Sequence, residues 1–493
     1  MAPTVHAAAR PQYGGVLRVE LRANSVNLHP AKWKAGSADF AANQRLAELL
    51  FDRLVTLDNY GRFQPQLATE WSHDSSAKRW QFTLRSGVKF SDGTGLTAGG
   101  VVTALQALLP RGMQVTASGG GVTIQCATPA GDLLELLASG PYFIYKDNGS
   151  GLLRGTGPFV LESVSASARE ADKAAGEGPG LQSQRLRFRA NENCWSGRPY
   201  LDAIEVTLGV PPLKSLLDLQ LGKTDFGELS VDTAKRAQQT NLKSWSSAPL
   251  TLYVLKFSGE GKTEQEQRLR EAIGLSVDRE AMARVLLQKQ AEAAATFLPQ
   301  WLSGYAFLFD AERNLERAKE LRAKLPPGLA GAAQPLRMTV DANNELSKLI
   351  AERVAVDARA AGLTLQTVKA GARAASDAAG SKSDGEAQLV AWRYTSLAPR
   401  DVLESLGSGQ RRQAAEAGVP ADADARYAWE KRMIEERTLL PLVAVPDFAA
   451  VDGRVRNWSP SPWGEWRLGD VWLEEGDAAN TGTAPKPLAG VRP

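Results

Sequence analysis

The residues that most often carry chemistry in proteins are scarce in this chain. Its 493 residues include three histidines, His6, His29 and His73, and two cysteines, Cys126 and Cys194. A metal site built by the protein alone would have to rely on carboxylates, so we expect neither a metal site nor a cofactor. The cysteines can pair in an oxidising compartment, but two buried free thiols are the expected state.

Motifs of the common catalytic sites are absent from the sequence. It contains no Gly-x-Ser-x-Gly, no His-Glu-x-x-His, no Cys-x-x-Cys and no Gly-x-Gly-x-x-Gly on a strand-to-helix turn. The paired carboxylates Glu435–Glu436 and Glu474–Glu475 fall on segments that we expect to be solvated. The sequence therefore gives no basis for catalysis, and we expect a protein that is not an enzyme.

One segment imitates a nucleotide-binding loop. Thr251–Phe257 reads as a strand, and a Gly-Lys-Thr sequence at Gly261 precedes a helix that begins near Glu264. The phosphate-binding motif needs a second glycine five positions before Gly261, where this chain has Lys256. A bulky side chain there would block the backbone from wrapping the phosphates, so we expect an exposed loop and no ATP binding.

The bulk composition is that of a soluble globular protein. The chain is 43% hydrophobic and 23% charged, with a formal net charge of +3 and no long like-charge block. We therefore expect no nucleic-acid partner. No apolar run approaches the roughly 18 residues needed to cross a bilayer. The length favours two or three lobes over one core.

The stretch that organises the chain is Glu48–Gly93. It starts in a helical apolar face that includes Leu49 and Leu50, and then turns into short strands separated by turn residues. Trp80, Phe82 and Leu84 alternate with polar residues, which is the period of a half-buried strand. The stretch thus predicts a helix followed by a small sheet.

The combination of residues in this stretch resembles the extracytoplasmic solute-binding proteins of family 5, the peptide, nickel and oligopeptide type. The matching residues are Leu67-Ala68, Trp71, Phe82, Leu84-Arg85, Gly87-Val88-Lys89-Phe90, Asp92-Gly93 and Leu96-Thr97-Ala98. Further matches are Gly155–Phe159 and Arg268–Gln288, where Asp278 is expected to cap a helix. At His29 the family commonly has Asp. The resemblance covers about residues 13–473.

The resemblance implies an α/β fold of the periplasmic-binding-protein-like type II (cluster C) class, with two main lobes, a hinge and a small extra subdomain in lobe I. The crossover strands near Leu252–Phe257 and Leu442–Pro446 would form the hinge, and lobe II would have its own sheet. The expected boundaries are residues 1–12 for a signal remnant or disordered N-terminus, 13–45, 155–250 and 440–473 for lobe I, 46–154 for the subdomain, 258–438 for lobe II and 474–493 for a disordered tail.

The resemblance also implies a function. A monomeric solute-binding protein in the periplasm, or otherwise outside the cytoplasm, would deliver a small ligand, peptide-like or other, to the transmembrane permease subunits of an ABC importer. The small residues near Val5–Ala9 fit the end of a truncated secretory signal, and a disordered tail fits them equally. The alternative is a binding module of the same fold that serves signalling or chaperoning.

The ligand loop of the peptide-binding branch corresponds to Ala391–Asp401 here. Trp392 and Pro399 match the family pattern, whereas Thr395 stands at or near the Asp that pairs with the peptide ammonium, and Ala398 replaces a second Asp. A buried ammonium without a carboxylate partner is costly. Binding of free peptides by the usual mode is therefore not expected.

Six residues are predicted to contact the ligand. Trp392 and Tyr394 would supply an aromatic wall. In the competing interpretation, Trp392 packs inside the lobe and Tyr394 covers a loop. Arg393 slightly favours an anionic ligand, and Trp33 is a weaker candidate for the opposite wall. The full set is Trp33, Trp392, Arg393, Tyr394, Thr395 and Asp401, of which Asp401 could replace the missing loop acid.

These substitutions predict weak or no binding of unmodified di- to pentapeptides. Calorimetry against a peptide mixture tests this, with N-acetylated peptides as the matched control. Micromolar or tighter binding that depends on the free N-terminus would overturn the prediction.

Overall fold

The structure is a computed structural model that describes residues 10–34, 37, 39–149, 153–167, 183–240, 242–259, 261, 263–310, 312–369, 387–407, 419–420 and 422–474. Two predicted segments fall largely outside these residues: the N-terminal segment 1–12 and the C-terminal tail 474–493.

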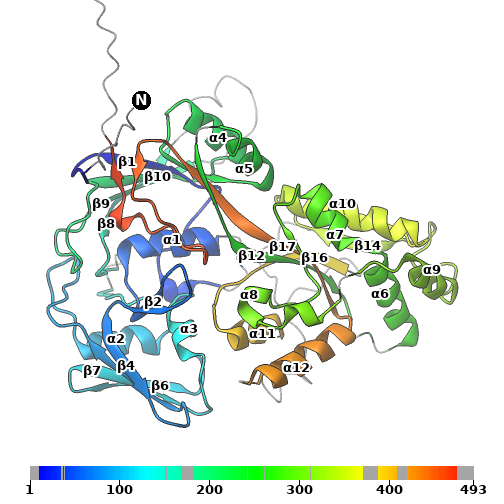
Figure 1. The fold of residues 1–493 in the computed structure, drawn as a ribbon, viewed down its shortest axis with the longest axis horizontal. Coiled ribbons are helices and arrows are strands. Elements are labelled where there is room, and N and C mark those ends of the chain that lie inside the picture. Colours follow the sequence, from blue (N-terminus) through cyan, green and yellow to red (C-terminus); the bar gives the residue numbers. More distant parts are fainter. Residues whose placement is uncertain are drawn as a thin grey trace, which may run out of the picture.

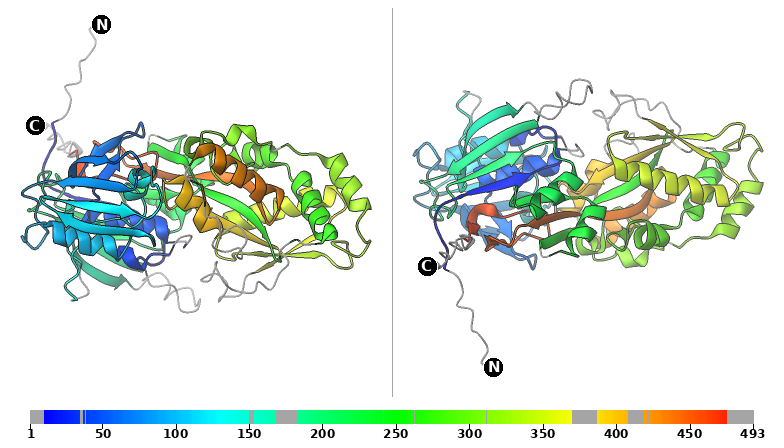
Figure 2. Two further views of the ribbon diagram at one scale, coloured as in Figure 1. Left: turned by 90° about the horizontal axis from the view of Figure 1, so that it is seen from below. Right: turned by 90° about the horizontal axis from the view of Figure 1, so that it is seen from above.

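One eleven-stranded sheet extends through both ends of the molecule (Figures 1 and 2). Its path is β15-β14-β16-β12-β17-β11-β1-β10-β9-β8, and β13 pairs with β17. The strands are β1 (Val16–Glu20), β8 (Phe159–Ser167), β9 (Ser183–Ala190), β10 (Ala203–Thr207), β11 (Phe226–Leu229), β12 (Lys243–Phe257), β13 (Glu292–Ala293), β14 (Leu336–Val340), β15 (Leu365–Lys369), β16 (Ala387–Arg393) and β17 (Leu439–Val451).

The prediction that lobe II has a sheet of its own is wrong. The long strands β12 and β17 belong to both halves of the molecule. Lys243–Ser246 of β12 pairs with the part of β17 that also pairs with β11, and Thr251–Phe257 of β12 pairs with β16. Local patterns reveal each half-strand but not that the two halves are continuous. Below, lobe I means residues 13–250 and 440–473, and lobe II means residues 258–438. These boundaries remain a prediction.

The ladder between β12 and β17 is interrupted where two prolines face each other. Pro249 is aligned with Pro446, and the register shifts on both sides of this pair. Proline has no backbone N–H to donate, so the ladder loses hydrogen bonds at this point. On β17 the interruption is at Pro446, the last residue of the predicted hinge segment Leu442–Pro446. On β12 it is at Pro249, just before the other predicted hinge segment, Leu252–Phe257.

Helices cover the sheet and connect its strands (Figure 1). They are α1 (Phe40–Leu50), α2 (Ala98–Gln106), α3 (Leu133–Leu137), α4 (Pro212–Gln220), α5 (Val231–Ala237), α6 (Glu264–Ser276), α7 (Arg279–Ala281), α8 (Gln300–Ser303), α9 (Leu315–Ala323), α10 (Glu345–Ala360), α11 (Pro399–Gly407) and α12 (Ala423–Glu435). The Asp278 carboxylate accepts the Ala281 N–H at 2.8 Å, which confirms the predicted cap.

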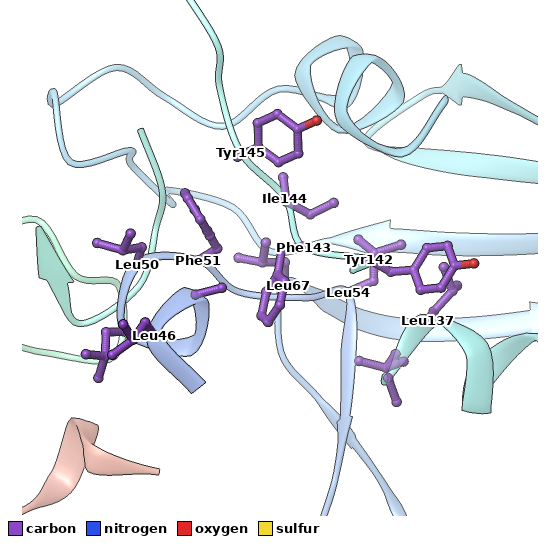
Figure 3. Packing of buried hydrophobic residues seen from close by; sticks show 14 of the residues in the cluster. Leu46, Leu50, Phe51, Leu54, Leu67, Leu137, Tyr142, Phe143, Ile144 and Tyr145 are labelled. Atoms are coloured by element: carbon purple, nitrogen blue, oxygen red, sulfur yellow. The ribbon is translucent and has the colours of Figure 1, made fainter. Parts of the chain in front are cut away.

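The predicted subdomain 46–154 contains a second sheet but shares its core with lobe I. This sheet has the order β4-β5-β7-β6. Leu17 and Phe226 of lobe I belong to the same buried cluster as Leu50, Leu137 and Phe143 of the subdomain, and Figure 3 labels the last three. The smaller strands are β2 (Val55–Leu57), β3 (Phe63–Pro65), β4 (Ala68–His73), β5 (Arg79–Leu84), β6 (Met113–Ser118), β7 (Gly121–Cys126), β18 (Val455–Arg456) and β19 (Trp472–Leu473).

The segment that resembles a nucleotide-binding loop caps the start of α6. The Thr263 hydroxyl accepts the Glu266 N–H at 3.2 Å, and the Glu266 carboxylate accepts the Thr263 N–H in return. This capping box satisfies two N–H groups that a helix start leaves free. The capping box explains why a threonine stands at position 263 without any role in phosphate binding.

Both cysteines are free thiols, so the disulfide alternative is wrong. Cys126 is buried in the core cluster of lobe I, as expected. Cys194 is only partly buried, and its Sγ lies 3.2 Å from the Ser196 hydroxyl.

The Gly155–Phe159 segment lies against the C-terminal end of α1. Gly157 N donates to the Leu50 carbonyl at 3.0 Å, and the Thr156 hydroxyl donates to Asp52 at 2.7 Å. A Cβ on Gly155 would lie 1.8 Å from the Leu50 oxygen. The glycines therefore serve a close backbone approach.

We predict that Gly155→Ala destabilises the protein by on the order of 1–3 kcal/mol or more, because the added methyl overlaps backbone that cannot yield. Thermal unfolding should show a midpoint several degrees lower. Gly131→Ala is the matched control, since a Cβ there has no neighbour within 4 Å. Equal midpoints for the two variants would contradict the packing role.

Candidate functional site

Parts of the chain that are far apart in the sequence converge on a small cavity between the lobes. Its volume is about 20 Å³, enough for about one water molecule. Helix α1 and the end of α3 come from lobe I, the loop after β16 comes from lobe II, and a C-terminal loop closes the cavity. The lining residues are Gln44, Ala138, Ser139, Gly140, Leu250, Tyr394, Thr395, Ser396, Leu397, Trp463 and Glu465.

A larger hollow of about 610 Å³ lies beside β6 and β7. It is lined by residues of α2, β6, β7 and their loops, and contains none of the predicted ligand contacts. The cavity between the lobes is the better candidate site, because the lobes meet there.

Two of the six predicted residues line this cavity. Tyr394 and Thr395 line it, and Arg393 precedes them at the end of β16. The Tyr394 hydroxyl donates to the Phe297 carbonyl at 2.8 Å, and burial raises the pKa of this hydroxyl well above its ordinary value. Tyr394 is therefore a fixed, neutral part of lobe II.

The other three predicted residues do not line the cavity. Trp392 is paired with Leu252 on the sheet and is partly buried against a cluster that also includes Tyr394, which corresponds to the packing interpretation. Trp33 donates its indole N–H to the Asn27 carbonyl at 2.7 Å. Burial raises the pKa of Asp401, which accepts a hydrogen bond from Ser396. A ligand contact by any of them stays a prediction.

The polar centre beside the cavity is an ion-pair network around Asp447 of β17. Arg393 donates two hydrogen bonds to its carboxylate, at 2.8 and 2.6 Å, and Arg45 of α1 donates one at 2.5 Å. Burial alone would raise the pKa of Asp447, but the two arginines outweigh burial and hold the pKa well below its ordinary value. Arg45 also pairs with Glu228 at 3.1 Å. Arg393, predicted to favour an anionic ligand, is thus already neutralised.

A second pair of carboxylates lies on the lobe I side. Glu465 pairs with Arg53 at 3.2 Å, and Arg53 also donates to the Gly140 carbonyl at 3.1 Å. Glu48 lies one helical turn after Gln44, whose amide donates to it at 3.4 Å. Burial and then repulsion by Glu465 raise the pKa of Glu48 to about 8, against the opposing effect of Arg53 and Arg45.

Aromatic side chains from both lobes meet at the cavity. The rings of Trp301, from α8 of lobe II, and Trp463, from the C-terminal loop, have centroids 5.2 Å apart. Trp301 also contacts Tyr394 edge-on at 6.2 Å. Sequence reasoning missed Trp463 and Glu465. A signal was present, since Trp458, Trp463 and Trp466 crowd a segment rich in Pro and Gly.

Within the described ranges, no group of three or more His, Cys, Asp or Glu side chains is arranged to hold a metal ion. None of the helices in those ranges has both the length and the apolar character of a membrane crossing.

Comparison with protein families gives one match over most of the chain. The family model described as bacterial extracellular solute-binding proteins, family 5 Middle, matches residues 62–414. A nickel-binding periplasmic protein of Escherichia coli is 24% identical over 370 residues, which cover 67% of this chain and 67% of that protein. The oligopeptide-binding protein AppA of Bacillus subtilis is 23% identical over 339 residues, which cover 64% of this chain and 60% of that protein.

Solved structures show the same fold. NikA from Brucella suis, in complex with Fe(III)-EDTA, superimposes with a TM-score of 0.73 at 20% identity, and covers 93% of this chain and 100% of its own. A dipeptide-binding protein from a Pseudoalteromonas species, in complex with Met-Leu, gives a TM-score of 0.75 at 16% identity with the same coverage. The fold class is therefore the predicted type II periplasmic-binding-protein fold.

We predict that Glu48 makes the protein less stable in alkaline solution. A carboxyl whose folded pKa is raised contributes stability that is complete below its unfolded pKa, near 4.5, and is lost as the pH rises towards about 8. The loss is at most about 1.4 kcal/mol per pH unit. Thermal midpoints between pH 5 and 9 should therefore fall more steeply for the native protein than for Glu48→Gln.

The matched control for this measurement is Glu70→Gln, which changes an exposed glutamate of β4. Its midpoints should follow the native curve. Parallel curves for the native protein and Glu48→Gln would show that Glu48 is not held protonated by its surroundings.

Proposed function

This chain belongs to the bacterial extracellular solute-binding proteins of family 5, and we propose that it captures a small solute between its two lobes and delivers it to the membrane subunits of an ABC importer. The family consists of substrate-binding proteins, which are not enzymes. In this proposal the protein works outside the cytoplasm and as a monomer.

The observation that carries the proposal is the convergence of both lobes on one cavity. Ser139 and Gly140 reach it from lobe I, Tyr394 and Thr395 from lobe II, and Trp463 from the C-terminal loop. Apolar rings beside a few polar groups are typical of small-molecule sites. Two segments joined by long strands can part and close around a solute, and closure then depends on contacts to both lobes.

The electrostatics of the cavity bear on the class of solute. Thr395 is uncharged, Asp401 has a raised pKa, and Glu465 already pairs with Arg53. None of these three offers an unpaired carboxylate to an ammonium group at the family position. This supports a solute other than an unmodified peptide, bound by rings and hydrogen bonds.

The experiment that tests the proposal begins with the protein purified from its native host without denaturation. Mass spectrometry of the denatured sample identifies any small molecule that was retained. Calorimetry with the refolded, solute-free protein then measures its affinity. A single bound solute at about one per chain is expected, and the absence of any retained molecule from cells grown on several media would count against solute binding.

We predict that Trp463→Ala weakens binding of that solute by about 2- to 10-fold, because an aromatic contact contributes about 0.5–1.5 kcal/mol. Trp392→Ala should weaken binding by roughly 5- to 100-fold if its ring contacts the solute, with about 1–3 kcal/mol of burial at stake. Trp71→Ala, on β4, is the control and should bind normally. Unchanged affinity in both test variants would show that neither Trp463 nor Trp392 contributes an aromatic contact to the solute.

A further inference from the structure

Helix α4 of lobe I carries leucines on two opposite sides. Leu216 and Leu219 are buried in the core of the protein. Leu213, Leu217 and Leu221 lie on the outer side, where they are 50%, 48% and 66% exposed. A helix on the surface of a globular protein normally has polar residues on its outer side. We therefore expect a second apolar surface to cover the outer leucines of α4.

The three outer leucines form one row, which we call the leucine row. They are four residues apart, and this spacing puts side chains on the same face of a helix. Leu221 N donates to the Leu217 carbonyl at 3.0 Å, so the helical geometry reaches the last leucine although α4 ends at Gln220. No other helix in the described ranges exposes three large apolar side chains. The leucine row thus differs from the scattered apolar exposure that is normal on protein surfaces.

The leucine row is separate from the candidate functional site. None of its residues lines the cavity between the lobes. Figure 1 shows α4 and α5 side by side at the edge of lobe I, on the side opposite to the small sheet of β4–β7. A partner of the leucine row would therefore not compete with a solute for the cavity.

The surface around the leucine row has an excess of positive charge. Each acidic side chain of α4 and α5 already has a basic partner one helical turn away: Lys214 with Asp218, and Arg236 with Asp232. Lys223 follows the leucine row, and Lys235 lies on α5; both are exposed. Neither lysine has an ion-pair partner among the residues that the structure describes. The two pairs cancel, so these two lysines leave a local charge of about +2 at neutral pH.

We propose that the leucine row, together with Lys223 and Lys235, binds the surface of an anionic membrane. The leucines would enter the boundary between headgroups and acyl chains, and the lysines would lie at the anionic headgroups. Exposed apolar side chains beside basic ones are typical of helices that lie in the plane of a membrane surface. Each lysine near an anionic surface adds to the attraction.

Protein partners suit this surface less well. A symmetric dimer of this chain through the leucine row would bring the unpaired lysines of both copies close together, and like charges repel. The residues that dominate binding between different proteins are mostly Trp, Tyr and Arg, whereas this row consists of Leu. The charge and the residue type therefore both favour lipid.

The expected membrane contact is reversible. Three short side chains and two charges bury little area compared with a membrane-spanning helix, and salt screens the charged part. If the protein serves an importer as proposed above, this contact would keep it near the membrane subunits. Only that consequence rests on the proposed function; the membrane contact itself does not.

Vesicle flotation tests the proposal with the full-length protein. One set of vesicles contains phosphatidylcholine with about one third phosphatidylglycerol as the anionic lipid, and the other contains phosphatidylcholine alone. The native protein should float with the anionic vesicles at low salt. Binding should fall at about 1 M salt, where the screening length is about 3 Å. Binding to the neutral vesicles should be weaker at every salt concentration.

Two double variants separate the apolar part from the charged part. Leu217→Gln with Leu221→Gln should weaken binding to the anionic vesicles at least about tenfold, which corresponds to about 1.4 kcal/mol. Lys223→Gln with Lys235→Gln should weaken binding and make it less dependent on salt.

The matched control is Leu349→Gln with Val356→Gln on α10 of lobe II, where the two side chains are 41% and 57% exposed. This control should float like the native protein. Circular dichroism should show that all variants are folded, which is expected because every substituted side chain is exposed.

Three results would overturn the proposal. The first is a native protein that does not float with the anionic vesicles, and the second is equal flotation of the leucine variant and the α10 control. The third, measured by light scattering, is a native dimer that the leucine changes convert to a monomer, since this would assign the leucine row to a second copy of the chain. No solute is used in these measurements, so a failure here would leave the proposed solute binding untouched.

Discussion

The structure depends on one carboxylate that two lobes share. Asp447 of β17 accepts hydrogen bonds from Arg393 of lobe II and Arg45 of lobe I. All three side chains are largely buried, and an unpaired charge at such a place costs several kcal/mol. Helix α1, the end of β16 and strand β17 must therefore meet at Asp447. The cavity lies beside it because the same three elements line it or lead into it.

The parts of the fold that sequence reasoning predicted are those whose causes are local. Alternation at Trp80, Phe82 and Leu84 predicted a strand, and the structure confirms it as β5, where Trp80 and Phe82 are buried. The helix cap at Asp278 was predicted from a few neighbouring residues and is also confirmed. In both cases the physical reason lies within one turn or one strand of the residue concerned.

The candidate site was harder to predict because its pairs join distant parts of the chain. Arg45 and Asp447 are 402 residues apart, and Arg53 and Glu465 are 412 apart. No local pattern marks Arg393 as a partner of Asp447, so its charge was read as available to a ligand. The same limit explains the single sheet, since its continuity depends on how β12 and β17 are aligned over their whole lengths.

The facing prolines Pro249 and Pro446 have a mechanical consequence for this shared sheet. A sheet that passes without a break through two bodies resists bending, because its hydrogen bonds would have to stretch together. At the proline pair the ladder is already incomplete. Twisting of one lobe relative to the other will therefore distort the sheet most at this pair, where fewer hydrogen bonds oppose it. The ease with which the lobes move relative to each other then depends on Pro249 and Pro446 in the sheet. The loops around the sheet need not change their conformation.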